Sequence, residues 1–401
     1  MELRDAVHLV QQFLYEHGFV ATLSTLADES GVKYETHQLK EGGQLMNILT
    51  AHHEMEHLRS EIEPQYNAAE MAELLQEGDK SYVNTPESTI ADIHSKAIIA
   101  LSFSPDEDKP LLASAAADST IALLNYETNQ LLSTIDIHKG GVLSVAFHPK
   151  NSNLLLTAAM DGYHNLVDVS DPSSPTVRQQ FKEHSKYVVR VSWSPDGEHF
   201  ATCSYDHSVA IYELEPEQRD SYVLKKRLNY PTNPEAIQFT PDGETLIVAV
   251  RDDNYLHYVN VHTFVDDPQN MNAQLDDHVS FSAMDLAISP DAKYILVATD
   301  KDRVIMFRLG SSQQLRNFYG NKNDGFSQPR VQWHPSGKYI YCTSQKSLLV
   351  YDVATQMVID RFTEHDAMLR DIKHHPSKNM LASCSYDKSI KFWTHFAKEE
   401  S

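Results

Sequence analysis

Residues 184–212 read HSKYVVRVSWSPDGEHFATCSYDHSVAIY, and this stretch decides the fold. It opens on His184, runs through alternating apolar and polar residues to Trp193, and turns at the Ser-Pro-Asp-Gly tetrapeptide of residues 194–197. A second run, rich in small residues, ends before Asp206, and a third run follows it. Short alternating runs bounded by Pro, Gly and Asp predict antiparallel β-strands joined by tight turns.

The same pattern recurs roughly every 45 residues, which marks the chain as a repeat protein. Seven copies are anchored on the proline of the turn, at Pro105, Pro149, Pro195, Pro241, Pro290, Pro335 and Pro376. Five of the copies carry a preceding histidine, at His94, His138, His184, His278 and His365. An aspartate follows the second run in every copy except the sixth, which has Gln345, at Asp118, Asp161, Asp206, Asp253, Asp302 and Asp387. Because one such unit cannot bury its own apolar faces, the copies are expected to pack against one another.

These residues resemble the repeats of the WD-repeat family over about residues 88–396. The resemblance implies four-stranded blades in a closed ring. The expected fold class is therefore mainly β, a seven-bladed WD-repeat β-propeller with a small α-helical N-terminal segment. The last copy has no fourth strand of its own, and Ser88 to Ile93, just ahead of the first copy, are predicted to supply it. That pairing would leave no open sheet edge at the joint.

The resemblance also implies a role for the recurring His and Asp residues. In the WD-repeat family, a His, a Ser, an Asp and a Trp form a buried hydrogen-bond network within a blade. Trp393 alone keeps the Trp, and Tyr212 and Tyr351 stand in for it elsewhere, so only the last blade is expected to form the full network, with His365 and Asp387. Blades four and six, which lack the His, are expected to be the softest. We therefore interpret these residues as blade stabilisers and not as a catalytic or metal site.

The N-terminal residues predict two short helices. Apolar residues recur on one helical face from Leu3 to Leu14, Gly18 ends the first helix, and a second helix ends near Gly31. Residues 9–30 resemble the LisH family, whose helical hairpins pair into dimers. A hairpin this short cannot bury its apolar face alone, which agrees with dimerisation. The residues expected at the dimer interface are Leu9, Val10, Phe13, Leu14, Phe19, Leu23 and Leu26.

The predicted organisation is thus a LisH-like dimerisation motif (1–40), a helical segment with a linker near its end (41–87) and the propeller (88–401). A hairpin folded back onto the propeller is the alternative to dimerisation. The layout is similar to that of the lissencephaly-type dynein regulators, but the degenerate repeats do not match their regular blades.

Composition excludes several function classes. The net charge of −22 disfavours general binding to nucleic acid and to anionic membranes. No apolar run is long enough to span a bilayer, and the first residues lack the apolar core of a secretion signal. Three scattered cysteines predict reduced thiols and a cytoplasmic or nuclear location.

No sequence motif gives firm support for a catalytic function. Residues 53–57 fit the zinc-protease pattern H-E-x-x-H, but the flanking segment is too short to build a substrate cleft, so a solvated charged helix is the preferred interpretation. Phosphate-binding, nucleophile-elbow and paired-cysteine motifs are missing. The sequence therefore predicts a protein that is not an enzyme and needs neither a cofactor nor a metal.

Propeller geometry supplies the candidate binding residues. The residues five before each turn proline are expected to ring the upper mouth of the central channel, at Ala100, Ser144, Arg190, Ala236, Asp285, Arg330 and Asp371. Residues just before the turn aspartate should stand beside them, at Met160, Tyr205, Lys301 and Tyr386. Arg and Tyr are frequent interface anchors, so the charged and aromatic members, together with Met160, are predicted to bind partners. The competing interpretation is that Arg190 with Asp371, or Arg330 with Asp285, only pair with each other.

The predicted function is a dimeric, non-enzymatic scaffold that presents its propeller to partner proteins. A ubiquitin-ligase substrate receptor is one alternative, weakened because residues 351–354 (Tyr-Asp-Val-Ala) lack the Arg that docks such receptors to the ligase. A cytoskeletal motor regulator is the other, supported only by layout.

Overall fold

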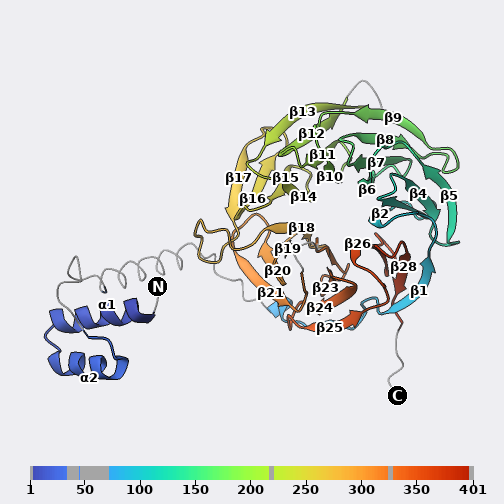
Figure 1. Cartoon of the computed structure of the whole chain (residues 1–401). Coiled ribbons are helices and arrows are strands. Elements are labelled where there is room, and N and C mark those ends of the chain that lie inside the picture. The colour runs from blue at the N-terminus through green and yellow to red at the C-terminus, as the bar shows by residue number, and fades with distance from the viewer. Residues whose placement is uncertain (1–2, 34–44, 46–71, 216–220, 324–327, 397–401) are drawn as a thin grey trace, which may run out of the picture. The chain divides into compact units, whose positions relative to one another are not determined.

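The computed structural model describes residues 3–33, 45, 72–215, 221–323 and 328–396. The chain divides into two compact units, Met1–Met71 and Ala72–Ser401. Within the described part of the second unit, the strands form seven four-stranded antiparallel sheets arranged around a central axis (Figure 1). The predicted seven-bladed propeller is therefore confirmed.

Each blade runs outward from an innermost strand. Blade one has β2 (Ile98–Phe103), β3 (Leu111–Ala116), β4 (Ile121–Asn125) and β5 (Gln130–Ile135). Blade two has β6 (Val142–Phe147), β7 (Leu154–Ala159), β8 (His164–Asp168) and β9 (Thr176–Phe181). Blade three has β10 (Val188–Trp193), β11 (His199–Ser204), β12 (Ser208–Leu214) and β13 (Tyr222–Asn229). Blade four has β14 (Pro234–Phe239), β15 (Thr245–Val250), β16 (Tyr255–Asn260) and β17 (Asp266–Asn270).

The remaining blades follow the same order until the last. Blade five has β18 (Ala283–Ile288), β19 (Tyr294–Thr299), β20 (Arg303–Arg308) and β21 (Gln314–Tyr319). Blade six has β22 (Val331–Trp333), β23 (Tyr339–Ser344), β24 (Ser347–Asp352) and β25 (Val358–Phe362). Blade seven has β26 (Leu369–His374), β27 (Met380–Ser385) and β28 (Ile390–Thr394), and its outermost strand is β1 (Thr85–Ile90).

The ring closes where β1 pairs with β28. Thr85 lies opposite Thr394 and Ile90 opposite Ile390. The predicted closing strand is therefore confirmed, although it begins and ends three residues earlier than expected. The two ends of the propeller share one sheet, which leaves no unpaired edge between the first and last blades.

The apolar core lies between neighbouring blades. The second strand of most blades is buried along its whole length, whereas the outermost strands are largely exposed. Phe103 of blade one packs against Phe392 of blade seven, with ring centroids 6.5 Å apart. A blade is thus stable only with neighbours on both faces, as the repeat pattern predicts.

The His–Asp network is complete in one blade and partial in three others. In blade seven His365 Nδ1 lies 2.7 Å from Asp387, its Nε2 lies 2.8 Å from Ser383 Oγ, and Trp393 Nε1 donates to the same Oγ at 2.8 Å. The prediction that the last blade makes the full network is confirmed. Blades one, two and three keep the His, the Asp and a Ser or Thr without the Trp. In blade three Tyr212 stands in place of the Trp, and its Oη lies 2.9 Å from Nε2 of His164 in the neighbouring blade.

Blade five corrects the expected pattern. His278 is exposed, and Asp302 accepts its hydrogen bond from the backbone of Asn323 instead of pairing with a histidine. Asp300 occupies the first position of the β19–β20 turn, where blade three has Tyr205, so the sequence alignment of this turn is off by one residue. The His–Asp blades are therefore seven, one, two and three, which are contiguous around the ring.

The N-terminal unit contains the two predicted helices, α1 (Leu3–Glu16) and α2 (Val20–Ser30). Gly31 caps α2 in the left-handed conformation at φ 68°, a geometry that glycine adopts without steric cost. None of the seven residues expected at a dimer interface is buried, and Phe19 is 52% exposed. The hairpin therefore has no apolar core of its own among the described residues.

Residues 72–84, which include most of the linker expected at residues 78–86, pack on the propeller. Leu74 is buried, Val83 N donates to Tyr341 Oη at 2.9 Å, and a Cβ at Gly78 would clash with the Tyr339 hydroxyl. The segment is thus a bound strap along blade six and not a free connection.

Candidate upper-rim binding site

The residues five before each turn proline do converge on the central channel. A cavity there is lined by six of the seven, all except Arg330. In most blades a β-bulge lies just before this position, for example between Val188 and Arg190. A bulge bends the strand and redirects its side chains, which turns these residues toward the axis.

Three of these residues, Arg190, Arg330 and Asp285, form ion pairs with one another inside the channel. Arg190 Nη2 lies 3.1 Å from Asp285 Oδ1, and Arg330 Nη1 lies 3.7 Å from the same oxygen. The side chains of Arg190, Arg330 and Asp285 are only 12%, 7% and 13% exposed. Burial raises the pKa of Asp285, against the opposing effect of Arg190. The Arg330–Asp285 pair considered from the sequence is present, and Arg190 makes its ion pair with Asp285 instead of Asp371.

Three of the ring residues also join adjacent blades. Asp285 Oδ2 accepts from Val331 N at 3.0 Å, and Asp371 Oδ2 accepts from Leu101 N at 2.9 Å. Ser144 Oγ accepts from Val191 N in the same way. Each bond satisfies a buried backbone donor of the next blade, so these side chains contribute to ring stability.

Two positions of each blade form the upper rim. In blade three they are Tyr187, three residues before the ring position, and Tyr205, directly after the second strand; Tyr205 N donates to Tyr187 O at 3.0 Å. Met160 and Tyr386 occupy the position of Tyr205 in blades two and seven. Asp300 takes it in blade five, so Lys301 is displaced by one residue from the rim position expected for it.

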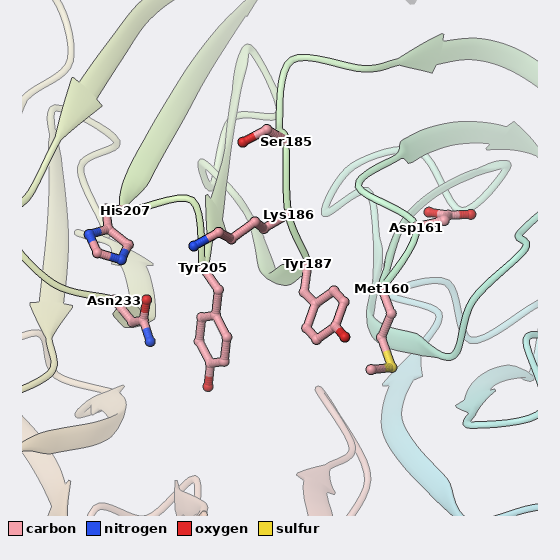
Figure 2. Close-up of a pocket in the computed structure, with 8 residues that line it drawn as sticks. All are labelled: Met160, Asp161, Ser185, Lys186, Tyr187, Tyr205, His207 and Asn233. Atoms are coloured by element: carbon pink, nitrogen blue, oxygen red, sulfur yellow. The ribbon is translucent and has the colours of Figure 1, made fainter.

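A pocket lies between blades two, three and four at this rim (Figure 2). Met160 and Tyr187 are 38% and 44% exposed. In Figure 2 the side chains of Met160, Tyr187 and Tyr205 extend in the same direction, whereas Asp161 turns away. The residues that line the pocket are Met160, Asp161, Ser185, Lys186, Tyr187, Tyr205, His207 and Asn233. Of these, the sequence analysis predicts only Met160 and Tyr205 as binding residues.

Hydrogen bonds hold Tyr205 in place. Its hydroxyl donates to Glu235 Oε2 at 3.0 Å, and Arg251 Nε pairs with the other oxygen of Glu235 at 2.6 Å. Burial and the carboxylate of Glu235 together raise the pKa of Tyr205 to about 12. The phenol therefore stays protonated, and its hydrogen bond to Glu235 holds the ring in place.

A contact across the channel links two of the predicted anchors. Gln328, which precedes β22, donates from Nε2 to Tyr205 Oη at 3.4 Å and accepts from Arg370 Nη2 at 2.8 Å. Arg370 in turn lies over the ring of Tyr386, 5.6 Å from its centroid. This line of side chains connects blades three, six and seven. No repeat position in the sequence distinguishes Gln328, because its role depends on reach across the axis.

Metal-binding side chains do not cluster in the described part of the chain. No group of three or more His, Cys, Asp or Glu among them could hold a metal ion, and the H-E-x-x-H segment lies outside them. All three cysteines are buried free thiols. No helix in this part of the chain is long and apolar enough to cross a membrane.

Comparison with known proteins agrees with the fold. The family described as "WD domain, G-beta repeat" matches residues 129–168, 175–213 and 357–394. The chain is 23% identical over 300 residues to human Pre-mRNA-processing factor 17, and the aligned region covers 64% of this chain and 50% of that protein. It is 22% identical to the Transcriptional corepressor LEUNIG_HOMOLOG of Arabidopsis thaliana, over 74% of this chain and 35% of the relative.

A third relative is covered almost fully. THO complex subunit 3 of Arabidopsis thaliana is 23% identical over 308 residues, which are 75% of this chain and 90% of the relative. By contrast, the chain spans about half the length or less of the other two relatives. The three repeat matches, set within seven four-stranded blades, support the assignment of this chain as a WD-repeat β-propeller protein.

Proposed function

We propose that this protein is a non-enzymatic adaptor that binds partner proteins through the upper rim of its propeller and dimerises through its N-terminal helices. The observation that carries the proposal is the pocket of Met160, Tyr187 and Tyr205, two of whose members are exposed on a rigid scaffold. Large exposed aromatic and Met side chains are typical anchors of protein interfaces. A preformed surface binds without the entropic cost of ordering itself.

The relatives support the same class of function. Their names refer to pre-mRNA processing, transcriptional corepression and the THO complex. We infer that this chain likewise acts as one subunit of a multiprotein complex and favour a nuclear location. Neither a ubiquitin ligase nor a motor regulator is among these relatives. Because the ring arginines form ion pairs inside the channel, we assign partner binding to the rim.

Affinity purification with quantitative mass spectrometry tests the rim. The Met160→Ala/Tyr187→Ala double variant should lose partners that the wild type retains. A matched control is Tyr319→Ala/Met357→Ala, because these residues are 59% and 64% exposed but lie on or next to outer strands. Equal loss in both variants, or loss in neither, would argue against binding at the rim.

The dimer is tested separately by light scattering. The wild type should give about twice its chain mass of 45.4 kDa. Phe13→Glu/Leu23→Glu should give a monomer, because moving carboxylates from water into an apolar interface costs free energy. A wild type that is monomeric at micromolar concentration would refute the dimer and favour the folded-back hairpin. Fluorescence microscopy of the tagged protein tests the nuclear location.

A further inference from the structure

Three lysines lie at matching places on consecutive blades. Lys96, Lys139 and Lys186 occupy the loops that enter blades one, two and three, each one or two residues after the network histidine. All three are exposed, and none forms an ion pair with another residue of the described chain. We call this set the basic arc. It lies beside the rim pocket, to which Lys186 itself contributes.

The His–Asp network fixes the loops that carry the arc. Asp118 accepts from Ser95 N at 2.7 Å, Asp161 from Lys139 N at 2.8 Å, and Asp206 from Ser185 N at 2.9 Å. Although burial opposes ionisation, hydrogen bonds from Thr120 and Ser95 lower the pKa of Asp118 to about 2. These three aspartates therefore accept hydrogen bonds from the loop backbone and do not form direct ion pairs with the lysines.

The exposed acidic residues of the same loops lie on the far side of the histidines. Asp92, Asp136 and Glu183 precede the histidine, where the chain has just left the outermost strand. The lysines follow it, where the chain enters the innermost strand. Each loop thus carries an acidic residue toward the periphery and a lysine toward the channel. Blade seven departs from this pattern, because Glu364 precedes its histidine and Asp366 takes the place of Lys139.

We propose that the basic arc and the adjoining pocket bind an acidic peptide segment of a partner protein. An apolar side chain of the peptide contacts Met160 and Tyr187, and its carboxylates contact Lys139 and Lys186. The inference deepens the proposed function and rests on it. A protein ligand fits better than nucleic acid, because a net charge of −22 repels a continuous phosphate backbone, whereas a short peptide meets only the local positive field.

The test begins with the full-length protein and a random-sequence peptide display library. Selected peptides should combine Asp or Glu with an apolar residue. A synthetic copy of the strongest binder, followed by fluorescence anisotropy, should bind more weakly as salt rises. Lys139→Glu/Lys186→Glu should weaken it about tenfold, or about 1.4 kcal/mol. Replacing the acids of the peptide with Lys should restore binding to that variant.

The matched control is Lys346→Glu/Lys388→Glu, since both residues are exposed in the turns of other blades. Thermal unfolding verifies that each variant remains folded. Neutral or basic binders that need Tyr187 but not the lysines would overturn the acidic ligand while leaving rim binding intact. Peptides that need neither would overturn both proposals. Binding of a single-stranded RNA oligonucleotide that competes for the arc would reassign the site to nucleic acid.

Discussion

Removing the carboxylate of Asp285 tests whether the charged ring inside the channel holds the propeller together. Asp285→Ala leaves the Arg190 and Arg330 guanidinium groups, 12% and 7% exposed, without their shared partner. It also removes the acceptor for Val331 N, which lies 3.0 Å away. Breaking a buried pair by removing one partner costs about 3 to 5 kcal/mol. We therefore expect the free energy of unfolding to fall by about 4 kcal/mol.

Urea denaturation followed by tryptophan fluorescence measures this loss. The control Asp136→Ala removes an exposed carboxylate and should change stability by less than about 0.5 kcal/mol. Asp285→Leu combined with Arg190→Met and Arg330→Met should recover most of the loss, because it removes the stranded charges as well. A stable Asp285→Ala variant that loses its partners would refute the structural role and return these residues to the binding site.

Three further changes probe other parts of the propeller. Trp393→Phe removes the donor to Ser383 in the complete network and should destabilise the protein by about 2 kcal/mol in the same assay; an unchanged midpoint would show that the indole N–H is dispensable. Burial lowers the pKa of His374 to about 4, so the folded state binds its proton less readily than the unfolded state, and stability present above about pH 6.5 should fall, by on the order of 3 kcal/mol, as pH drops toward 4. His374→Gln should flatten that pH dependence in urea titrations, and an equally steep curve would assign it to other groups. Gly78→Ala should clash with Tyr339 and make the strap at residues 72–84 more sensitive to limited proteolysis, whereas unaltered cleavage would show that the strap shifts to accept the methyl group.

The features from which we propose partner binding lie on one side of the ring. Blades seven, one, two and three hold their entry loops with His–Asp pairs, and the rim pocket and the basic arc both lie within or beside this half. A loop tied by several hydrogen bonds can present a charged side chain in a fixed place. The softer behaviour expected of blades four and six stays a prediction.

Most of the fold could be predicted from the sequence because the repeat signals are local. The turn prolines, alternating strands and small residues each act within one hairpin, so their meaning survives in the sequence even where the Trp is lost. Local signals also predicted the helix ends at Gly18 and Gly31. Blade five shows where it fails, because His278 matches the pattern by its letter but stands outside the network in space.

The sequence by itself determined the number of blades, the closing strand and the side chains that reach the channel. These features follow from periods of two residues and of about one blade, which a linear chain displays directly. Only the tertiary structure decided which charges neutralise one another, that Gln328 reaches Tyr205 across the axis, and that the strap is bound. Those contacts join residues far apart in the chain, and their geometry is set by ring closure and bulges that no local pattern encodes. Ring closure thereby turns Arg190 and Arg330 inward to Asp285, which supports our proposal that partners bind at the rim.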